Sequence, residues 1–519
     1  MTAEQLAQVA EDAKSLIRKA TSRKAGHMAS SFGVARLTVA VHARLKTPDD
    51  VLIWDVGHQA YVHKVLTGRA DEFHLNRTPE GPSGFPKRAE SEHDAFGAGH
   101  SSTSISALMG FARADQLQGV ERHRVAVIGD GAFTGGMVYE AMNDAGNRGD
   151  DVLVILNDNG LAIEENTGAL HAHKRYQTLA ESMGWHYCGD VSDVDMGALL
   201  DAIDTALSSS GPRLLRVTTT RPTEAELGAS GTVDEQSFQK GFARALREMA
   251  SEDERIVALT AAMAPGCSLT DFRDEFPERF FDVGIAEPHA VTTAAGMACA
   301  GLKPIINLYS TFSQRAVDQW IHDVALQKLP VILCLDRAGI VGEDGATHHG
   351  VFDLAIFRSI PETAVWTPYD ERSLRDAMRH AAQYGGPSVI RYPKGLMPNV
   401  PEPEVEGMQV DVFRHGTGVM HWCIGPVVKE VLDQVDPGDS VVALRMVKPL
   451  PQAMMARMAR NHYQWTVWED GQVINGIGSA LASWVAETGQ SGLTVYRKGY
   501  PDKFIGHGPQ EALIQAHRR

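Results

Sequence analysis

Residues 124–131 read Arg124-Val125-Ala126-Val127-Ile128-Gly129-Asp130-Gly131, and residues 151–159 read Asp151-Val152-Leu153-Val154-Ile155-Leu156-Asn157-Asp158-Asn159. Both apolar runs are typical of buried parallel strands. Residues 136–147 between them predict a crossover helix, which completes a strand–helix–strand unit. Because parallel strands end at the same edge of a sheet, we expect Asp130 and Asn159 to emerge together at the edge where open α/β sheets bind ligands.

These two acceptor side chains suit a hard cation. A carboxylate and an amide oxygen are ligands that Mg²⁺ uses, and its remaining positions are open to phosphate oxygens. The glycines on either side of Asp130 allow a diphosphate to approach the backbone and the N-terminus of the following helix. A plain Gly-Asp-Gly turn without a ligand is the alternative interpretation.

Bulk composition restricts the classes of function. A chain of 519 residues is too long for one core, and its net charge of −16 argues against a nucleic-acid or anionic-membrane surface. An anionic substrate would therefore need a local cluster of arginines. The five scattered cysteines predict core thiols in a reducing cytosol rather than disulfides or zinc ligands. The sequence has no apolar stretch of about 18 residues and no N-terminal signal pattern, so we expect a cytoplasmic protein.

Alternating strand-like and helix-like segments divide the chain into three consecutive α/β domains, each with a mostly parallel central sheet. We expect them to cover residues 1–220, 236–396 and 411–519. Residues 221–235 and 397–410 are polar or rich in proline and glutamate, which predicts linkers. His171 and His173 fall in a polar stretch of the first domain, so we expect both to be solvated.

Glu287 is the candidate catalytic carboxyl of the second domain. It follows an apolar strand and precedes a small-residue helix at 290–300, so we expect it to be buried. A buried carboxyl without a partner has a raised pKa, which suits a hydrogen bond to the ring nitrogen of an aminopyrimidine such as that of thiamine. A glutamate that interacts with the helix dipole is an equally good alternative. Phe312 would offer the pyrimidine an aromatic face, or would simply pack in the core.

Several longer motifs resemble the 1-deoxy-D-xylulose-5-phosphate synthase family of thiamine diphosphate enzymes. They are Trp54-Asp55-Val56-Gly57-His58-Gln59-Ala60-Tyr61, Gly99-His100-Ser101-Ser102-Thr103-Ser104 and Asp336-Arg337-Ala338-Gly339-Ile340-Val341-Gly342, with further similarity at residues 309–315, 344–348 and 391–393. The similarity covers nearly the whole chain in the family's order. It implies three domains of the transketolase-like type and a homodimer.

The resemblance implies that pyruvate loses CO₂ on thiamine diphosphate and that the two-carbon unit is added to D-glyceraldehyde 3-phosphate. It assigns Mg²⁺ to Asp130, Asn159 and the backbone of Leu161. The implied cofactor-binding residues are His58, Gly99, His100, Ser101, Gly131, Ala132, Asn159, Glu287 and Phe312. The implied catalytic residues are Glu287, which activates the cofactor, and His27, Asp344 and His348, which transfer protons or orient substrate.

The resemblance also assigns the triose phosphate to Tyr309, Arg315, Arg337 and Arg391. The planar fork of arginine fits phosphate, and these residues would supply the positive site that an acidic chain needs. Each assignment has a simpler alternative, because single histidines are commonly surface or satisfied core residues and arginines after strands commonly form surface ion pairs.

Two segments depart from the family pattern. Only residues 171–182 stand where the family carries a long insertion, and residues 218–225 replace a Lys-Gly-x-Gly-Tyr stretch. We predict retained cofactor binding, with weakened or altered catalysis as an alternative to full activity. A transketolase-like ketol transferase and a catalytically silent binding protein are further alternatives. A nicotinamide dehydrogenase is disfavoured because Gly129-x-Gly131 lacks the third glycine of that motif.

Overall fold

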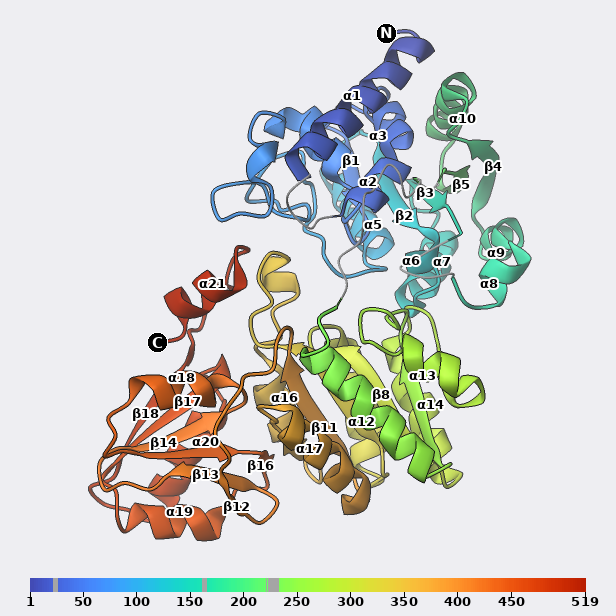
Figure 1. Cartoon of the computed structure of the whole chain (residues 1–519). Helices are drawn as coiled ribbons and strands as arrows, with labels where there is room; N and C mark the ends of the chain where they lie inside the picture. Colours follow the sequence, from blue (N-terminus) through green and yellow to red (C-terminus); the bar gives the residue numbers. More distant parts are fainter. Residues whose placement is uncertain (22–26, 161–165, 221, 223–232) are drawn as a thin grey trace. The chain divides into compact units, whose positions relative to one another are not determined.

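The computed structural model describes residues 1–519 except 22–26, 161–165, 221 and 223–232 (Figure 1). The chain forms two compact units. The first unit comprises Met1–Gly231 with Gly284–Ala286, and the second comprises Thr232–Val283 with Glu287–Arg519. In the described part, no helix is long and apolar enough to cross a membrane.

The first unit contains a five-stranded parallel sheet in the order β1-β2-β3-β5-β4. Its strands are β1 (Val51–Trp54), β2 (Arg124–Gly129), β3 (Val152–Asp158), β4 (His186–Ser192) and β5 (Pro212–Thr218). Its helices are α1 (Ala3–Thr21), α2 (Met28–Gly33), α3 (Ala35–His42), α4 (Tyr61–Lys64), α5 (Ser104–Gln118), α6 (Asp130–Phe133), α7 (Gly136–Arg148), α8 (Ala169–His173), α9 (Tyr176–Ser182) and α10 (Met196–Ser208).

Both faces of this sheet are apolar, which explains why helices cover both. Successive strand residues point to opposite faces, and along β2 Val125 and Val127 enter one core whereas Ala126 and Ile128 enter the other. Helices α1, α3 and α10 cover the first face, and α5, α7 and α9 cover the second. The unbroken apolar runs that predicted these strands therefore follow from burial on both sides.

The second unit contains two sheets, and both are mostly parallel. The first of them has seven strands in the order β16-β10-β11-β9-β8-β6-β7. These strands are β6 (Ile256–Thr260), β7 (Phe280–Asp282), β8 (Lys303–Tyr309), β9 (Ile332–Ala338), β10 (Ala364–Trp366), β11 (Ser388–Pro393) and β16 (Met446–Lys448). Only β16 runs antiparallel to its neighbour, β10.

The last sheet has six strands in the order β12-β13-β15-β14-β17-β18. Its strands are β12 (Glu404–Glu406), β13 (Val410–Arg414), β14 (Met420–Ile424), β15 (Ser440–Leu444), β17 (Gln464–Gln472) and β18 (Thr494–Tyr500). Strand β16 follows β15 in sequence but pairs in the seven-stranded sheet, and one apolar core contains residues of both sheets. This shared strand and core explain why the last two sheets form a single compact unit.

The helices of the second unit pack on these two sheets. They are α12 (Phe238–Glu252), α13 (Thr270–Glu275), α14 (Glu287–Cys299), α15 (Val317–Gln319), α16 (Asp353–Ser359), α17 (Glu371–Tyr384), α18 (Val427–Gln434), α19 (Gln452–Ala459), α20 (Ile477–Glu487) and α21 (Gln510–His517). Helix α17 begins at a capping box in which Asp370 accepts from the Ser373 amide and Ser373 accepts from the Asp370 amide.

The three predicted parallel α/β sheets are thus present, with two local corrections. The predicted linker 397–410 contains β12, because Glu404–Glu406 pair antiparallel with β13 rather than remaining unpaired, although Glu404 and Val405 are exposed. The prediction that all cysteines are core thiols is wrong for Cys299, which is exposed, whereas Cys267, Cys334 and Cys423 are buried.

Candidate active site

The Gly-Asp-Gly motif forms the turn from β2 into α6. Asp130 is 2% exposed, and its carboxylate accepts from the backbone amides of Gly131 at 3.0 Å and Gly160 at 2.8 Å. Because β2 and β3 pair in register at their carboxyl ends, Asp130 lies beside Asp158, the last residue of β3. Burial, reinforced by the neighbouring Asp158 carboxyl, raises the pKa of Asp130 to about 7.

Asp158 is held in its charged form by a cation from β5. Arg216 donates to it from Nε at 2.8 Å and from Nη2 at 2.6 Å. Burial alone would raise the pKa of Asp158, but the hydrogen bonds and the charge of Arg216 outweigh burial, so this pKa is lowered.

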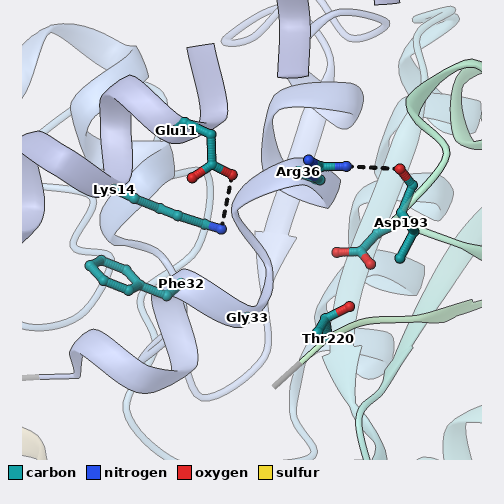
Figure 2. Close-up of a pocket in the computed structure, with 8 residues that line it drawn as sticks. Glu11, Lys14, Phe32, Gly33, Arg36, Asp193 and Thr220 are labelled. Carbon is teal, nitrogen blue, oxygen red and sulfur yellow. Dashed lines mark hydrogen bonds and ion pairs between the residues drawn. The ribbon is translucent and has the colours of Figure 1, made fainter. Parts of the chain in front are cut away.

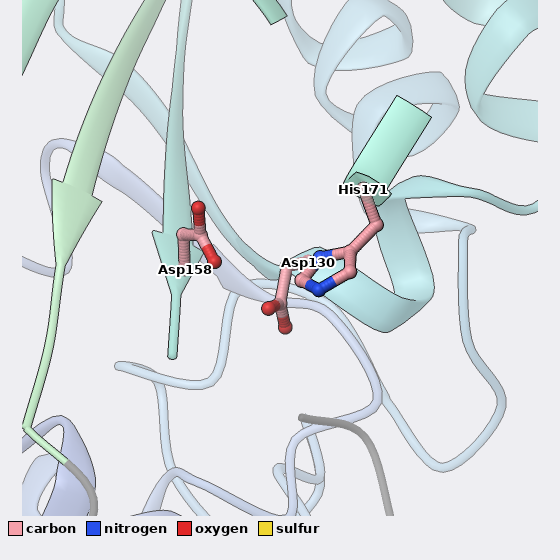
Figure 3. A group of neighbouring side chains, drawn as sticks. All are labelled: Asp130, Asp158 and His171. Carbon is pink, nitrogen blue, oxygen red and sulfur yellow. The ribbon is translucent and has the colours of Figure 1, made fainter. Parts of the chain in front are cut away.

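His171 lies against this pair, contrary to the expectation that it is solvated. One nitrogen of its ring, one oxygen of Asp130 and one oxygen of Asp158 all lie within 4.8 Å of one another (Figure 3). His173, two residues later in α8, is exposed as expected. The polar sequence around both histidines gave no sign that the first one folds back onto the sheet edge.

Three more of the residues predicted to bind the metal and the diphosphate lie at the carboxyl ends of β2 and β3. Gly131 and Ala132 are buried in α6, and Asn159 directly follows β3 in a half-buried position. Leu161 lies outside the described residues.

The Gly99-His100-Ser101 stretch is tied to the same edge by the serine that follows it. Ser102 donates from its hydroxyl to the Ala132 carbonyl at 2.7 Å, and its amide donates to the Asp55 carboxylate at 2.7 Å. The Ser104 amide also donates to Asp55, at 3.0 Å. Asp55 therefore joins two of the family-like motifs, a role that sequence reasoning missed although Asp55 lies within a quoted motif.

His58, in the segment after β1, lies close to His27, which directly precedes α2. Their ring centroids are 6.2 Å apart, and the His27 ring packs 4.9 Å from that of Phe85. Burial, with a smaller contribution from His27, lowers the pKa of His58 to about 3, so His58 is neutral at physiological pH. Within the described structure, the buried Nδ1 of His58 has no hydrogen-bond partner.

A separate hollow of about 230 Å³ opens elsewhere on the first unit (Figure 2). Its lining residues are Glu11, Lys14, Phe32, Gly33, Arg36, Asp193, Val194 and Thr220. None of the residues predicted to act in catalysis or binding lines it, so it does not belong to the candidate active site.

Glu287 is the first residue of α14 in the second unit. It is 5% exposed, and burial raises its pKa, while the charge of Arg315 acts in the opposite direction. Its Oε2 has no hydrogen-bond partner among the described residues. The position agrees with a helix-terminal glutamate, but that interpretation leaves a buried polar atom unexplained. A hydrogen-bonding group of a ligand would satisfy it.

An aromatic cluster in the same unit joins three of the predicted residues. The ring of Phe312 stacks on that of Tyr309 with centroids 5.2 Å apart and lies edge-on to His348 at 5.4 Å. All three side chains are half-buried. They lie where β8 ends and in the loop after β9, so the cluster offers an aromatic face at a sheet edge.

Arg337 adds a positive charge to this cluster. It is the next-to-last residue of β9 and has a φ of +60°. It forms an ion pair with Asp336 and donates to the Gly266 carbonyl at 2.9 Å. Although burial opposes its charge, Asp336 keeps the pKa of Arg337 above its ordinary value. With 18% of its side chain exposed, Arg337 remains accessible to an anion.

Arg391 is more enclosed than the prediction of a phosphate-binding residue requires. It is 3% exposed, and its Nε lies 3.0 Å from both carboxylate oxygens of Asp353. Its Nη2 donates to the Asp470 carbonyl at 2.8 Å. In the described structure Arg391 thus joins the last two sheets.

The loop that carries Asp344 and His348 is held by the C-terminal part of the chain. The next residue, His349, accepts at Nδ1 from the Val341 amide at 3.1 Å and donates from Nε2 to the Gly506 carbonyl at 3.1 Å. A small apolar core binds the same two segments, formed by Ile340, Tyr500, Ile505 and Leu513. Nothing in the sequence indicated this contact, because the two segments are more than 150 residues apart.

Comparisons with known proteins find a similar family for the region of each of the three sheets. Sequence profiles match residues 1–180 to 1-deoxy-D-xylulose-5-phosphate synthase, residues 234–400 to the transketolase pyrimidine binding domain and residues 428–518 to the transketolase C-terminal domain. The 1-deoxy-D-xylulose-5-phosphate synthase of Thioalkalivibrio sulfidiphilus (strain HL-EbGR7) is 40% identical over 99% of this chain and 90% of that protein. The 1-deoxy-D-xylulose-5-phosphate synthase 1 of Geobacter sulfurreducens is 39% identical over 98% of this chain and 92% of that protein.

The chain belongs to the 1-deoxy-D-xylulose-5-phosphate synthase family.

Membership confirms the resemblance and the transketolase-like fold. This member of the 1-deoxy-D-xylulose-5-phosphate synthase family is nevertheless short. Its alignment with the Thioalkalivibrio relative spans 580 positions whereas the chain has 519 residues, so at least 61 aligned positions have no residue here.

Proposed function

We propose that the chain is a thiamine diphosphate-dependent transferase that decarboxylates pyruvate and adds the remaining two-carbon unit to D-glyceraldehyde 3-phosphate. The products are 1-deoxy-D-xylulose 5-phosphate and CO₂. Family membership supports this reaction. The structural observation that carries it furthest is Glu287, a buried carboxyl whose Oε2 has no partner among the described residues and whose pKa is raised by burial.

In this proposal Glu287 forms a hydrogen bond to the ring nitrogen of the aminopyrimidine, and Phe312 stacks on that ring. When bound, thiamine diphosphate supplies a nucleophilic carbon and an electron sink for the decarboxylation. A protonated carboxyl suits the task because it donates to a ring nitrogen without burying a second charge. The half-buried face of Phe312 next to His348 supports the stacking role.

The diphosphate group and a divalent cation fit the sheet edge of the first unit. We assign the cation, Mg²⁺ in the simplest case, to Asp130, Asn159 and the backbone of Leu161. The buried carboxylate of Asp130 and the amides at the start of α6 support this assignment. The residues that line the diphosphate and thiazolium in the proposal are His58, Gly99, His100, Ser101, Gly131 and Ala132.

The triose phosphate is assigned to Arg337, with Tyr309 and Arg315 beside it. The partial exposure of the Arg337 side chain and its raised pKa support a permanent positive charge for the phosphate. For Arg391 the same role requires its ion pair with Asp353 to open, so the contribution of Arg391 is the weakest of the set.

His348, Asp344 and His27 are assigned to proton transfer and substrate orientation. The His348 ring contacts Phe312 and forms a 2.9 Å hydrogen bond with Thr347, which orients the imidazole. His27 packs beside the buried His58. An imidazole ring can both take up and release a proton, which suits these roles.

A product assay tests the proposal. The purified chain, thiamine diphosphate and Mg²⁺ are incubated with pyruvate labelled at C1 and with D-glyceraldehyde 3-phosphate. We expect labelled CO₂ and 1-deoxy-D-xylulose 5-phosphate in equal amounts, and both products about 100-fold or more slowly from Glu287→Gln. Exchange between sugar phosphates without CO₂ would instead indicate a ketol transferase. Failure to bind thiamine diphosphate in calorimetry would indicate a silent relative.

The proposal also includes a homodimer and a cytoplasmic location, as the family resemblance implies. Light scattering of the purified chain measures the assembly, and cell fractionation with an antibody to the chain measures the location. A monomer that retains full synthase activity would contradict the dimer.

A further inference from the structure

Three metal-ligating side chains converge at the end of the first sheet, and two of them are outside the proposed Mg²⁺ set. Asp130, Asp158 and His171 each place one ligand atom within 4.8 Å of the other two (Figure 3). They come from α6, β3 and α8, so three separate elements bring them together. Of the three, only Asp130 belongs to the set proposed above.

The charges at this cluster leave room for a cation. Asp130 and Asp158 are 2% and 5% exposed, and two buried carboxylates side by side repel each other unless a proton or a cation lies between them. Arg216 pairs with Asp158. Within the described ranges, no cationic side chain pairs with Asp130, so a metal ion at this carboxyl would not compete with a protein cation.

The ring of His171 is placed for a cation rather than for a direct hydrogen bond. Its Nδ1 is buried and has no hydrogen-bond partner in the described part of the chain. Neither carboxylate of the cluster hydrogen-bonds to the ring there, although a ring nitrogen lies within 4.8 Å of both. Two ligands at about 2.0–2.2 Å from one metal ion lie no more than about 4.4 Å apart, so three ligand atoms within 4.8 Å of one another can bind the same ion after small shifts of their side chains.

We propose that His171 supplies an imidazole ligand to the divalent cation at the diphosphate site, with Asp130 and Asp158 on its other side. This inference rests on the proposed function, because it concerns the same cation. Mg²⁺ prefers oxygen ligands alone, whereas an imidazole ligand favours transition metals. The site of this chain therefore selects Mn²⁺ over Mg²⁺ more strongly than a site with oxygen ligands only.

Pulsed electron paramagnetic resonance of bound Mn²⁺ tests the ligand directly. The full chain is loaded with MnCl₂, with and without thiamine diphosphate, and the spectrum is searched for coupling to a directly bound imidazole nitrogen. His171→Ala removes the ligand, and His173→Ala is the matched control, because His173 is exposed two residues later in the same helix. The dissociation constant for Mn²⁺ and its competition by MgCl₂ are measured on the same samples.

We expect nitrogen coupling in the unsubstituted chain and in His173→Ala, and none in His171→Ala. The Mn²⁺ affinity of His171→Ala should fall about tenfold or more, with a smaller change for Mg²⁺. Absence of nitrogen coupling in the unsubstituted chain, or an unchanged preference for Mn²⁺ in His171→Ala, would overturn the inference. If product still forms with Mg²⁺ in those cases, the proposed function stands. Nitrogen coupling in a chain that does not bind thiamine diphosphate would support His171 as a metal ligand but would refute the proposed function.

Discussion

The guanidinium carbon of Arg337 lies 4.0 Å from the ring centroid of Tyr309. The cation and the ring attract each other, and the ring fixes the direction in which the guanidinium points. Because Tyr309 also stacks on Phe312, the proposed phosphate-binding charge and the proposed pyrimidine-binding ring are parts of one rigid cluster. The stacking of Tyr309 on Phe312 does not involve Arg337. A change at Arg337 should therefore weaken substrate binding and leave the two stacked rings in place.

Arg337→Ala should reduce kcat/KM for D-glyceraldehyde 3-phosphate about 10- to 100-fold, since a hydrogen bond to a charged group contributes about 1.5–3 kcal/mol. Arg337→Lys should recover only part of the loss, because lysine keeps the charge but lacks the planar fork. Steady-state kinetics measures both. Arg379→Ala, which removes a partly exposed arginine paired with Glu252, is the control and should behave like the unsubstituted chain. Equal kinetics for Arg337→Ala and Arg379→Ala would contradict the assignment.

Glu287→Gln should lower kcat about 10²- to 10⁴-fold, the range of a positioned acid–base group. The amide matches the carboxyl in size but cannot transfer a proton, so thiamine diphosphate should still bind in calorimetry. The decisive measurement is the rate at which the thiazolium C2 proton of the bound cofactor exchanges with deuterium, followed by NMR.

The exposed Glu278 provides the control as Glu278→Gln. An exchange rate in Glu287→Gln that matches the rate in this control would remove Glu287 from cofactor activation.

His58 should make stability depend on pH. In the folded chain its pKa is lowered to about 3 by burial, whereas the ordinary value of histidine is 6.5. Between pH 3 and 6.5 the unfolded chain binds the extra proton, so this contribution to stability is complete above pH 6.5 and is lost as the pH falls toward 3. The slope for one such group is at most about 1.4 kcal/mol per pH unit.

His58→Asn should flatten the pH dependence of the free energy of unfolding below about pH 6. Guanidinium chloride unfolding at several pH values measures it, with the exposed His186 changed to Asn as the control. If the free energy of unfolding has the same pH dependence in His58→Asn and in the His186 control, His58 gains its proton equally in the folded and unfolded chain.

Gly339→Ala should destabilise the second unit more than Gly425→Ala. The two glycines have nearly the same φ, +76° and +77°, so each alanine carries a similar backbone strain of about 1–2 kcal/mol. A Cβ at Gly339 would lie 2.0 Å from Oδ2 of Asp470, whereas a Cβ at Gly425 would meet nothing within 4 Å.

The difference between these two variants in the free energy of unfolding isolates the crowding at Asp470. We expect about 1–3 kcal/mol, because Asp470 is buried and must move from its present place. Chemical denaturation measures the difference, and equal destabilisation would show that the Asp470 side chain yields without cost.

Features that depend on local sequence could be predicted. The apolar runs predicted β2 and β3 because both faces of their sheet are buried, and the residue after β2 therefore had to lie at the sheet edge. The small-residue helix after Glu287 likewise predicted its burial, which the structure shows at 5% exposure.

Features that depend on contacts between segments distant in the sequence could not be predicted. His171 stands in a polar segment, and only the return of α8 to the sheet edge places its ring beside Asp130. The exposed strand β12 is defined by its partner β13 rather than by its own residues. The contact of His349 with Gly506 joins segments that no local pattern connects.

Strand β16 has a consequence for how this chain can be divided or recombined. Residues 446–448 come from the last third of the chain but complete the edge of the seven-stranded sheet beside β10. A chimaera that replaced everything after residue 410 would remove the edge strand of the preceding sheet and expose the backbone of β10 to other chains. The smallest exchangeable module is therefore the pair of sheets, so genetic shuffling within this family should preserve both sheets together.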